Sequence, residues 1–259
     1  MRGTRLPTAH MRVRSVPPDA TPHALLPDER RAGSDGPAAA GHRTPAPAGA
    51  SILEVLESVG LPTRAFDPGT IAHSERVATY ATEIAAALGL SRAEIHRVRL
   101  GAYLHDVGKI KVSPGILRKP GRLTDAEFAV MKMHPVWGLE VLEGAQLRVD
   151  VRPTIRWHHE KCDGTGYPDG LRGDQIPLHA TIVAVADVYD ALTSSRSYRP
   201  PMSSSGAMAL MRVRQAWWRP DVYAAFCRAA ATTALGAALL VAAAAATRRR
   251  EVAIEAAEA

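Results

Sequence analysis

Residues 158–170 read HHEKCDGTGYPDG, and they concentrate side chains that could bind a metal ion or a phosphate group. His158, His159 and Glu160 stand directly before a stretch in which glycines and a proline recur, a composition typical of a constrained turn. Histidine is the commonest metal ligand, so adjacent imidazoles at the edge of such a turn indicate a binding site. An isolated histidine pair is more often a solvated helix end, because short motifs produce many false matches. The rest of the chain decides between these two interpretations.

Further histidines and aspartates fall near the expected ends of helices. Together with the adjacent pair, the candidate ligands are His73, His105, Asp106, His134, His158, His159 and Asp187. Asp187 stands in a stretch from Leu178 to Leu192 that is almost wholly apolar, where a carboxylate is costly unless a cation or a strong donor faces it. These candidates lie on five separate segments, which a helical bundle could bring to one cavity.

This set of ligands predicts a particular chemistry. Mixed imidazole and carboxylate ligands in this number are too many for one tetrahedral zinc ion. They suit two octahedrally coordinated ions, iron or manganese, bridged by an aspartate and a hydroxide. Two ions roughly 3.5 to 4 Å apart favour in-line displacement at phosphorus, because one activates the nucleophile and both stabilise the developing charge. Lys109, one turn after Asp106, could neutralise a phosphate oxygen, although a lysine there is by itself more often a solvated helix end.

Short, capped helices must position these residues. Apolar periodicity and end signals predict helices over about 52–59, 67–88, 91–109, 124–135, 136–142, 153–160, 178–192, 206–214 and 220–228. Ser91 with Glu94, and Thr124 with Glu127, have the spacing of capping boxes. We therefore expect an all-α helical bundle over residues 51–228.

The segments on either side of this domain differ from it in composition. Residues 1–50 are rich in Arg, Pro, Ala and Gly without apolar periodicity, so we expect a disordered tail without a signal peptide. Residues 229–247 form an uncharged, alanine-rich run as long as a membrane span. So many alanines make partitioning into lipid marginal, and a membrane segment and a soluble Ala-rich helix both stay open. Residues 248–259 read as a charged C-terminal tail.

Charge and cysteine content narrow the class of partner and the compartment. The chain has 32 Lys and Arg against 26 Asp and Glu, a net charge of +6, which permits an anionic partner such as a nucleotide or a lipid head group. No motif for a nucleic-acid polymer is present. The two cysteines form no CxxC pair, which fits a reducing, cytoplasmic setting. Cys162 lies within the central stretch, where a spectator thiol is a simpler interpretation than a ligand among histidines and carboxylates.

The ordered set of motifs resembles a known family. His73, His105-Asp106 and Asp187 resemble the ligands of the HD phosphohydrolase superfamily, although the HD dipeptide alone is a weak signal. The segments HDVGKI, LRKPGRLT, HHEKCDGTGYPDGL and VADVYDALTSSRSYR make residues 51–228 similar to the HD-GYP subfamily of cyclic di-GMP phosphodiesterases. As an ordered set they are highly specific.

The resemblance implies an HD-domain helical bundle with an extension, the GYP loop, which contains Gly166, Tyr167 and Pro168. Its activity would be hydrolysis of a cyclic dinucleotide to linear pGpG, or on to GMP, by a metal-activated hydroxide. By this resemblance all the candidate ligands above bind two divalent metal ions, with Asp106 and Lys109 catalytic, and the substrate is contacted by Lys109, Arg196, Arg199, Gly166, Tyr167 and Pro168. The arginines would hold substrate phosphates, which suits their bidentate geometry. In the family the GYP loop has also been linked to contacts with diguanylate cyclase domains.

The chain departs from the family pattern in two places. Some members with three metals carry a glutamate one turn before the first histidine ligand, where this chain has Gly69, so we expect two metals. In place of the sensory or receiver domain that often precedes this domain, we expect only the 1–50 tail, which leaves the regulation of the activity open.

Three other functions compete with this one. Another HD hydrolase would leave His134, His158, His159 and the GYP loop unexplained. A catalytically silent module that binds the dinucleotide or docks cyclases would be favoured by loss of a ligand, and none of the two-metal set is missing. A membrane-tethered form of either depends only on residues 229–247.

Overall fold

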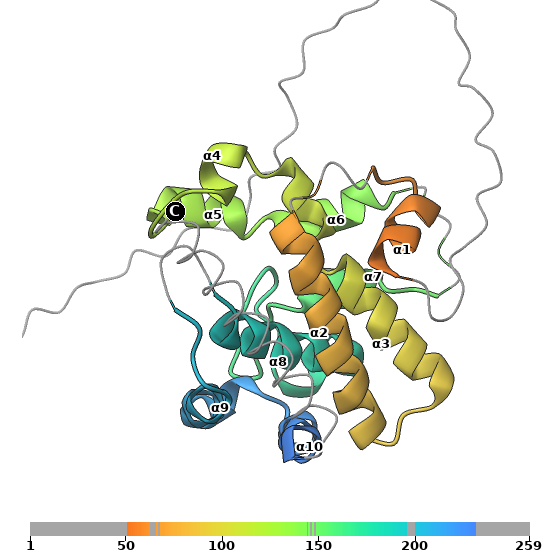
Figure 1. Cartoon of the computed structure of the whole chain (residues 1–259), viewed down its shortest axis with the longest axis vertical. Coiled ribbons are helices and arrows are strands. Elements are labelled where there is room, and N and C mark those ends of the chain that lie inside the picture. The colour runs from red at the N-terminus through yellow and green to blue at the C-terminus, as the bar shows by residue number, and fades with distance from the viewer. Residues whose placement is uncertain are drawn as a thin grey trace, which may run out of the picture. The chain divides into compact units, whose positions relative to one another are not determined.

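The computed structural model describes residues 51–62, 66, 68–143, 145, 147, 149–195 and 200–231. Its elements, in chain order, are α1 (Ile52–Ser58), α2 (Pro68–Ala87), α3 (Arg92–Leu104), η2 (Val107–Lys111), α4 (Pro114–Leu117), α5 (Asp125–Met131), α6 (His134–Val141), α7 (Arg152–Trp157), η3 (Gly173–Gln175), α8 (Leu178–Thr193), α9 (Ser204–Val213), η4 (Gln215–Trp217) and α10 (Pro220–Ala231), where η marks a 3-10 helix. Within these residues the single sheet-like pairing is an isolated bridge between Asp163 and Arg172. The expected all-α class is confirmed (Figure 1).

The predicted flanking segments fall largely outside this description. The tail over 1–50 and the charged segment 248–259 are not among the described residues, and of 229–247 only the last residues of α10 are. Across the described part of the chain, no helix combines the length and the apolar character that a membrane span requires.

Side-chain caps explain where several helices begin. The Ser91 hydroxyl accepts a hydrogen bond from the Glu94 backbone N–H, and the Glu94 carboxylate accepts one from the Ser91 N–H at 3.0 Å. Thr124 and Glu127 make the same reciprocal pair at the start of α5. Both predicted capping boxes are therefore confirmed, and each satisfies backbone donors that a helix start leaves free.

His134 lies at a different kind of helix end from the one expected. The sequence suggested that it closes the preceding helix, but α5 ends at Met131 and His134 is the first residue of α6. Pro135 occupies the first turn of α6, where its missing N–H costs nothing because that donor has no partner inside the helix.

The core is built around α2 and α8. Helix α2 packs against α3, α8 and α10, and α7 also contacts α8 (Figure 1). Tyr189 of α8 is fully buried, and its ring lies edge-on to Tyr80 of α2 at 5.4 Å and to Phe226 of α10 at 5.1 Å between ring centroids. Because α8 is buried over most of its length, it also carries Asp187 and Asp190 into the interior.

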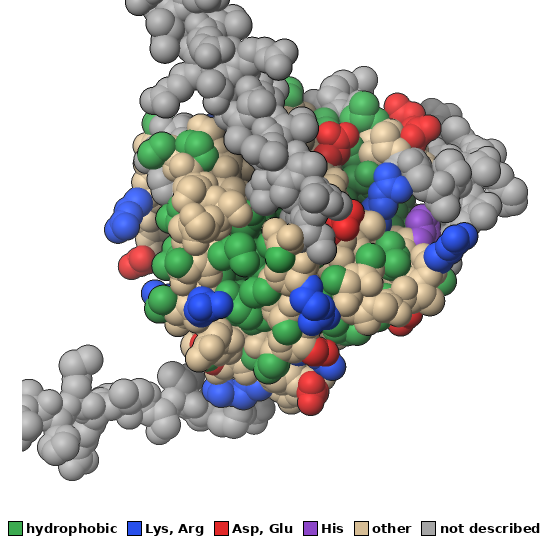
Figure 2. Space-filling view, turned by 60° about the horizontal axis from the view of Figure 1, so that its bottom comes forward, with side chains coloured by type: hydrophobic (Ala, Val, Ile, Leu, Met, Phe, Trp, Pro, Cys, Tyr) green, Lys and Arg blue, Asp and Glu red, His purple; other side chains and the backbone are tan. Residues whose placement is uncertain are grey.

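The face of the molecule shown in Figure 2 carries no stripe of basic side chains among the described residues. On the face shown in Figure 2, the Lys and Arg side chains of the described residues lie apart, separated by apolar and other side chains. A backbone-binding stripe needs such cations to be clustered.

A close backbone contact joins η2 to α6 and depends on Gly108. A Cβ atom at this position would lie 2.0 Å from the His134 carbonyl oxygen and 2.5 Å from the Gly138 nitrogen. Only glycine allows this approach, which brings the segment after Asp106 against the start of α6.

We expect Gly108→Ala to lower the free energy of unfolding by about 3 kcal/mol, because the methyl group meets backbone atoms that cannot move aside. Gly115→Ala is the matched control, since a Cβ there meets nothing within 4 Å, and we expect it to be neutral or slightly stabilising. Urea denaturation followed by circular dichroism measures both. Equal stabilities for the two variants would contradict the close contact.

Candidate metal centre

Seven predicted ligands from five segments of the chain converge on one place inside the bundle. They come from α2 (His73), the end of α3 (His105 and Asp106), the start of α6 (His134), the end of α7 (His158 and His159) and the middle of α8 (Asp187). Two groups have all their ligand atoms within 4.8 Å of one another: His73, His105 and Asp106 in the first, and Asp106, His134, His158 and His159 in the second. Asp106 belongs to both groups.

The two oxygens of Asp106 face different groups. Its Oδ2 lies 3.4 Å from Nε2 of His105 and 3.6 Å from Nε2 of His73. Its Oδ1 lies 3.3 Å from Nε2 of His134. A carboxylate so placed can bridge two ions, one on each oxygen.

Asp187 is also placed between the two groups. Its Oδ1 lies 3.2 Å from Nε2 of His73, and its Oδ2 lies 3.9 Å from Nδ1 of His159. A cation that balances the charge of Asp187 in its apolar surroundings would therefore lie between this carboxylate and the histidines that face α8.

Three of the histidines are held in the same way by a nearby backbone carbonyl. The Nδ1 atoms of His105, His134 and His158 lie 2.7, 2.8 and 2.8 Å from the backbone oxygens of Ala102, Met131 and Ile155, each three residues earlier. A carbonyl oxygen only accepts, so each Nδ1 carries the proton. With the proton on Nδ1, a neutral ring presents a lone pair at Nε2, as metal-binding histidines do.

The facing Nε2 atoms of His134 and His158 test whether a metal fits. They are 3.2 Å apart, yet both rings already carry their proton on Nδ1. Two lone pairs at this distance repel each other unless a cation lies between them or one ring is protonated. Burial lowers the pKa of His134 to about 4 and holds that of His158 well below its usual value, so both rings are neutral near pH 7. The donor set therefore fits a metal cation.

Unpartnered buried atoms point the same way. Among the described residues, Nε2 of His105 and Oδ1 of Asp106 are buried without a hydrogen-bond partner. Such atoms are costly to bury unless something coordinates them.

The protonation states of the remaining ligands follow from burial and neighbouring charge. Burial lowers the pKa of His159 to about 3. Burial would raise the pKa of Asp106, but the Lys109 ammonium and the His105 ring hold it well below its usual range. Burial would lower the pKa of His73, but its bonds to Asp187 and Asp190 outweigh this and raise it to about 9. A metal ion binding at Nε2 of His73 must displace that proton.

Lys109 contacts the centre directly. Its Nζ donates to Oδ2 of Asp106 at 2.5 Å, and the side chain is one quarter exposed. The ammonium therefore stands between the shared carboxylate and solvent.

The loop after His159 covers one side of the centre. The Tyr167 ring stacks on the His159 ring, with 4.7 Å between centroids and 28° between planes, and the Tyr167 N–H donates to the His159 carbonyl at 3.3 Å. Gly166 packs so closely on the Glu160 backbone that a Cβ would lie 2.4 Å from the Glu160 Cα. Pro168 follows Tyr167 through a cis peptide bond. The three predicted loop residues thus lie beside the metal centre.

The Glu160 carboxylate holds the backbone of this loop in place. It is 3% exposed and accepts hydrogen bonds from the backbone N–H groups of Asp169, Gly170 and Leu171 at 2.7, 3.0 and 3.1 Å. The sequence placed Glu160 within the motif but gave it no role. Arg196 and Arg199, the predicted phosphate-binding arginines, lie outside the described residues.

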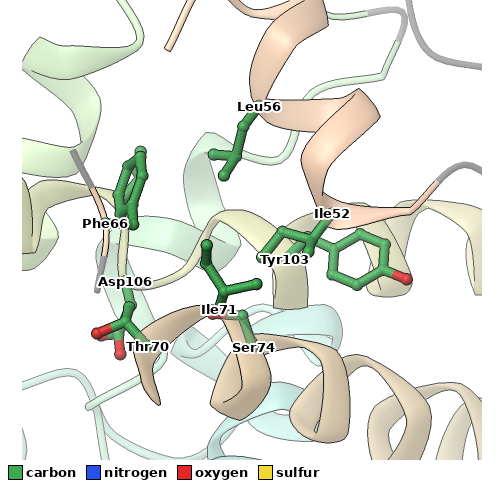
Figure 3. A pocket seen from close by; sticks show the side chains of 9 residues that line it. Ile52, Leu56, Phe66, Thr70, Ile71, Ser74, Tyr103 and Asp106 are labelled. Atoms are coloured by element: carbon green, nitrogen blue, oxygen red, sulfur yellow. The ribbon is translucent and has the colours of Figure 1, made fainter. Parts of the chain in front are cut away.

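A small apolar pocket lies beside Asp106, which forms part of its wall. Figure 3 shows Asp106 beside Thr70 at one side of this pocket, which Leu56, Phe66 and Ile71 also line. These apolar walls lower the local dielectric, which strengthens electrostatic interactions of the carboxylate.

Sequence reasoning missed two residues that orient His73. Asp190 is buried, its Oδ2 lies 2.7 Å from Nδ1 of His73, and its two oxygens accept from Arg76 at 2.6 and 3.0 Å. A carboxylate behind a ligating histidine is a common support of metal sites. The available signal was the spacing, since Asp190 follows Asp187 by one helical turn in an otherwise apolar helix.

We expect Asp190→Asn to weaken metal affinity about 10- to 100-fold, because the amide accepts more weakly from His73 and Arg76. Competition with a chelator of known affinity measures the change. Asp221→Asn, at an exposed ion pair on α10, is the control and should leave the affinity unchanged. An Asp190→Asn protein with parental affinity would exclude this supporting role.

Comparisons with known proteins agree with this geometry. The HD domain family matches residues 66–222. The cyclic di-GMP phosphodiesterase response regulator RpfG of Xanthomonas campestris is 47% identical over 148 residues, covering 56% of this chain and 39% of that protein. A cyclic di-GMP phosphodiesterase of Thermotoga maritima is 40% identical over 155 residues, covering 58% of this chain and 41% of that protein.

Relatives with a different named substrate match as well. The 3'3'-cGAMP-specific phosphodiesterase 2 of Vibrio cholerae is 42% identical over 134 residues, covering 51% of this chain and 26% of that protein. The chain thus spans less than half the length of these curated relatives. In fold it is similar to Bd1817, described as a HDG"Y"P protein from Bdellovibrio bacteriovorus, with a TM-score of 0.51, 22% identity and coverage of 68% of this chain and 55% of the other.

Proposed function

This chain belongs to the HD-domain family, and from that membership we propose that it is a metal-dependent phosphodiesterase that hydrolyses cyclic di-GMP to linear pGpG, to GMP, or to both. The relatives named as cyclic di-GMP phosphodiesterases support the substrate class. The family match over residues 66–222 includes the candidate ligands and the GYP loop.

One observation supports the reaction most directly: Asp106 is shared by two groups of candidate ligands, and its two oxygens face the Nε2 atoms of His105 and His134. A shared carboxylate is what two adjacent cations need, and two adjacent cations suit displacement at phosphorus.

We assign the metal ligands accordingly. His73 and His105 would hold one divalent ion, His134, His158 and His159 the other, and Asp106 and Asp187 would contact both. Iron or manganese is favoured because the donors are imidazole and carboxylate without thiolate. When bound, two such ions supply charge stabilisation and a nucleophilic hydroxide at neutral pH. Gly69, in the first turn of α2, offers no ligand for a third ion.

Other residues would bind the substrate around this centre. The Lys109 ammonium, already beside Asp106, would contact a phosphate oxygen and offset charge that develops on it. Gly166, Tyr167 and Pro168 would form the loop wall, with Tyr167 fixed against His159. Arg196 and Arg199 would hold the second phosphate.

We further propose residues 51–228 as the catalytic unit, which agrees with the family match over 66–222. Docking of diguanylate cyclase domains on the GYP loop, and association with a membrane through residues 229–247, remain predictions from the sequence. A cytoplasmic location would follow from the cyclic dinucleotide substrate.

The test is an anaerobic assay of the purified full chain loaded with Fe(II) or Mn(II). Cyclic di-GMP and 3'3'-cGAMP are incubated separately, the products are separated by chromatography, and Asp106→Ala serves as the inactive control. Linear dinucleotide or GMP from the parent and none from the control would support the proposal. Turnover of 3'3'-cGAMP alone would reassign the substrate, and intact substrates with two metals bound would favour a silent binding module.

A further inference from the structure

Helix α5 presents apolar side chains to solvent although it lies beside the metal centre. None of its residues is fully buried, and Phe128, with 46% of its surface exposed, is the most open aromatic residue in the described part of the chain. Because it is so exposed, Phe128 contributes little to the core.

The helix is nevertheless held in place. The Thr124 capping box fixes its first turn, and the Lys119 ammonium bonds both oxygens of Glu127 at 2.9 and 2.6 Å. Phe128 therefore stands on an anchored element rather than on a loose end.

A series of rings connects Phe128 to the metal centre. The Phe128 ring lies edge-to-face with the Tyr167 ring, with 6.5 Å between centroids and 81° between planes. Tyr167 in turn stacks on the metal-facing His159. Phe128 thus borders the same side of the centre as the GYP loop.

A cation lies over the Phe128 ring. The Nζ of Lys132, one helical turn later, is 5.3 Å from the ring centroid, a cation–π distance. An apolar ring with an ammonium beside it matches a purine nucleotide, which offers a flat aromatic face together with acceptors such as guanine O6 and N7.

We propose that Phe128 is a substrate-binding residue on which one purine base of the cyclic dinucleotide stacks while the phosphodiester lies at the metal centre. This proposal rests on the proposed function. A single ribose separates a base from its phosphate, so a base near Phe128 is compatible with a phosphate near Asp106 and Lys109. Stacking of this kind contributes about 1–3 kcal/mol per base.

The test compares Phe128→Ala, Phe128→Leu and Phe128→Trp with the parent, using cyclic di-GMP turnover by the Mn(II)-loaded full chain. Stacking acts equally on the ground state and the transition state, so KM should rise about tenfold in the Ala and Leu variants with kcat unchanged. Phe128→Trp should keep the parental KM. Val130→Ala, on the same helix and 37% exposed, is the matched control and should not change KM.

A second measurement distinguishes stacking of a base on Phe128 from an apolar contact of Phe128 with the GYP loop. Binding of the non-hydrolysable bis-phosphorothioate analogue of cyclic di-GMP, measured by calorimetry, should weaken by the same factor in the Ala and Leu variants. A leucine variant with parental KM and affinity would overturn the proposal, because leucine keeps the apolar contact and lacks the ring. If the parent neither binds nor hydrolyses the dinucleotide, the proposed function fails; if the parent is active and Phe128→Ala is unchanged, only the stacking proposal fails.

Discussion

Replacing Asp106 with asparagine should abolish turnover and remove both metals from the protein. The asparagine amide has nearly the same shape as the carboxylate but cannot bridge two cations through two charged oxygens. Lost metal charge at the reacting phosphate is worth several kcal/mol, which corresponds to a fall in kcat of about 10³-fold or more. Product chromatography gives the rate, and elemental analysis gives the metals bound per chain.

Two further variants test whether both metals are lost because Asp106 is a ligand of both. His73→Ala removes a ligand from the first group only, so about half of the metal should remain. Asp174→Asn removes an acidic side chain that is almost fully exposed, and it should leave both metal content and rate unchanged. Circular dichroism melting excludes global unfolding as the cause. An Asp106→Asn protein that still binds two metals would contradict the bridging role.

Glu160→Ala should detach the GYP loop while the helical bundle stays folded. The buried carboxylate satisfies three backbone N–H groups, and its removal leaves these donors without a partner. Each bond to a charged acceptor contributes about 1.5–3 kcal/mol, so we expect a loss of at least about 3 kcal/mol, part of it as local opening. Tyr167 lies in this loop and would lose its position beside His159 when the loop opens. Turnover should therefore fall by at least about tenfold.

Hydrogen exchange of residues 163–171 measures the opening, and thermal unfolding measures the global change. Glu140→Ala is the control: its carboxylate is half exposed and paired with Lys111 at the surface, so its removal should change stability by less than about 0.5 kcal/mol. Unchanged exchange over 163–171 in Glu160→Ala would show that other contacts hold the loop.

The fold was predictable because its signals are local. Capping boxes at Ser91 and Thr124, and apolar periodicity between them, fix helix starts within a few residues of the chain. The wrong prediction for His134 arose because the local signal there is ambiguous. A proline after a histidine reads equally as the end of one helix or the first turn of the next, and tertiary packing decides which.

The metal centre was only partly predictable. The types and order of residues indicated seven candidate ligands, and the structure brings all seven together. Asp190 was missed because its spacing from Asp187 indicates a shared face of α8 but not the contact with His73, which is 117 residues earlier in the chain. The contact of Phe128 with Tyr167 was missed for the same reason, since it joins two segments that sequence spacing does not relate.

The carbonyl contacts of the histidines bear on how this site can change by mutation. His105, His134 and His158 are oriented by main-chain oxygens, which every amino acid supplies, so no single substitution behind them can delete the acceptor. Among the described contacts, His73 alone of these four leans on a side chain, Asp190. A substitution of Asp190 on α8 could therefore change the orientation of His73, and with it the metal affinity, by a small step. For the other three histidines, the acceptor is kept whatever residue supplies the carbonyl, so their orientation is less sensitive to substitution of that residue.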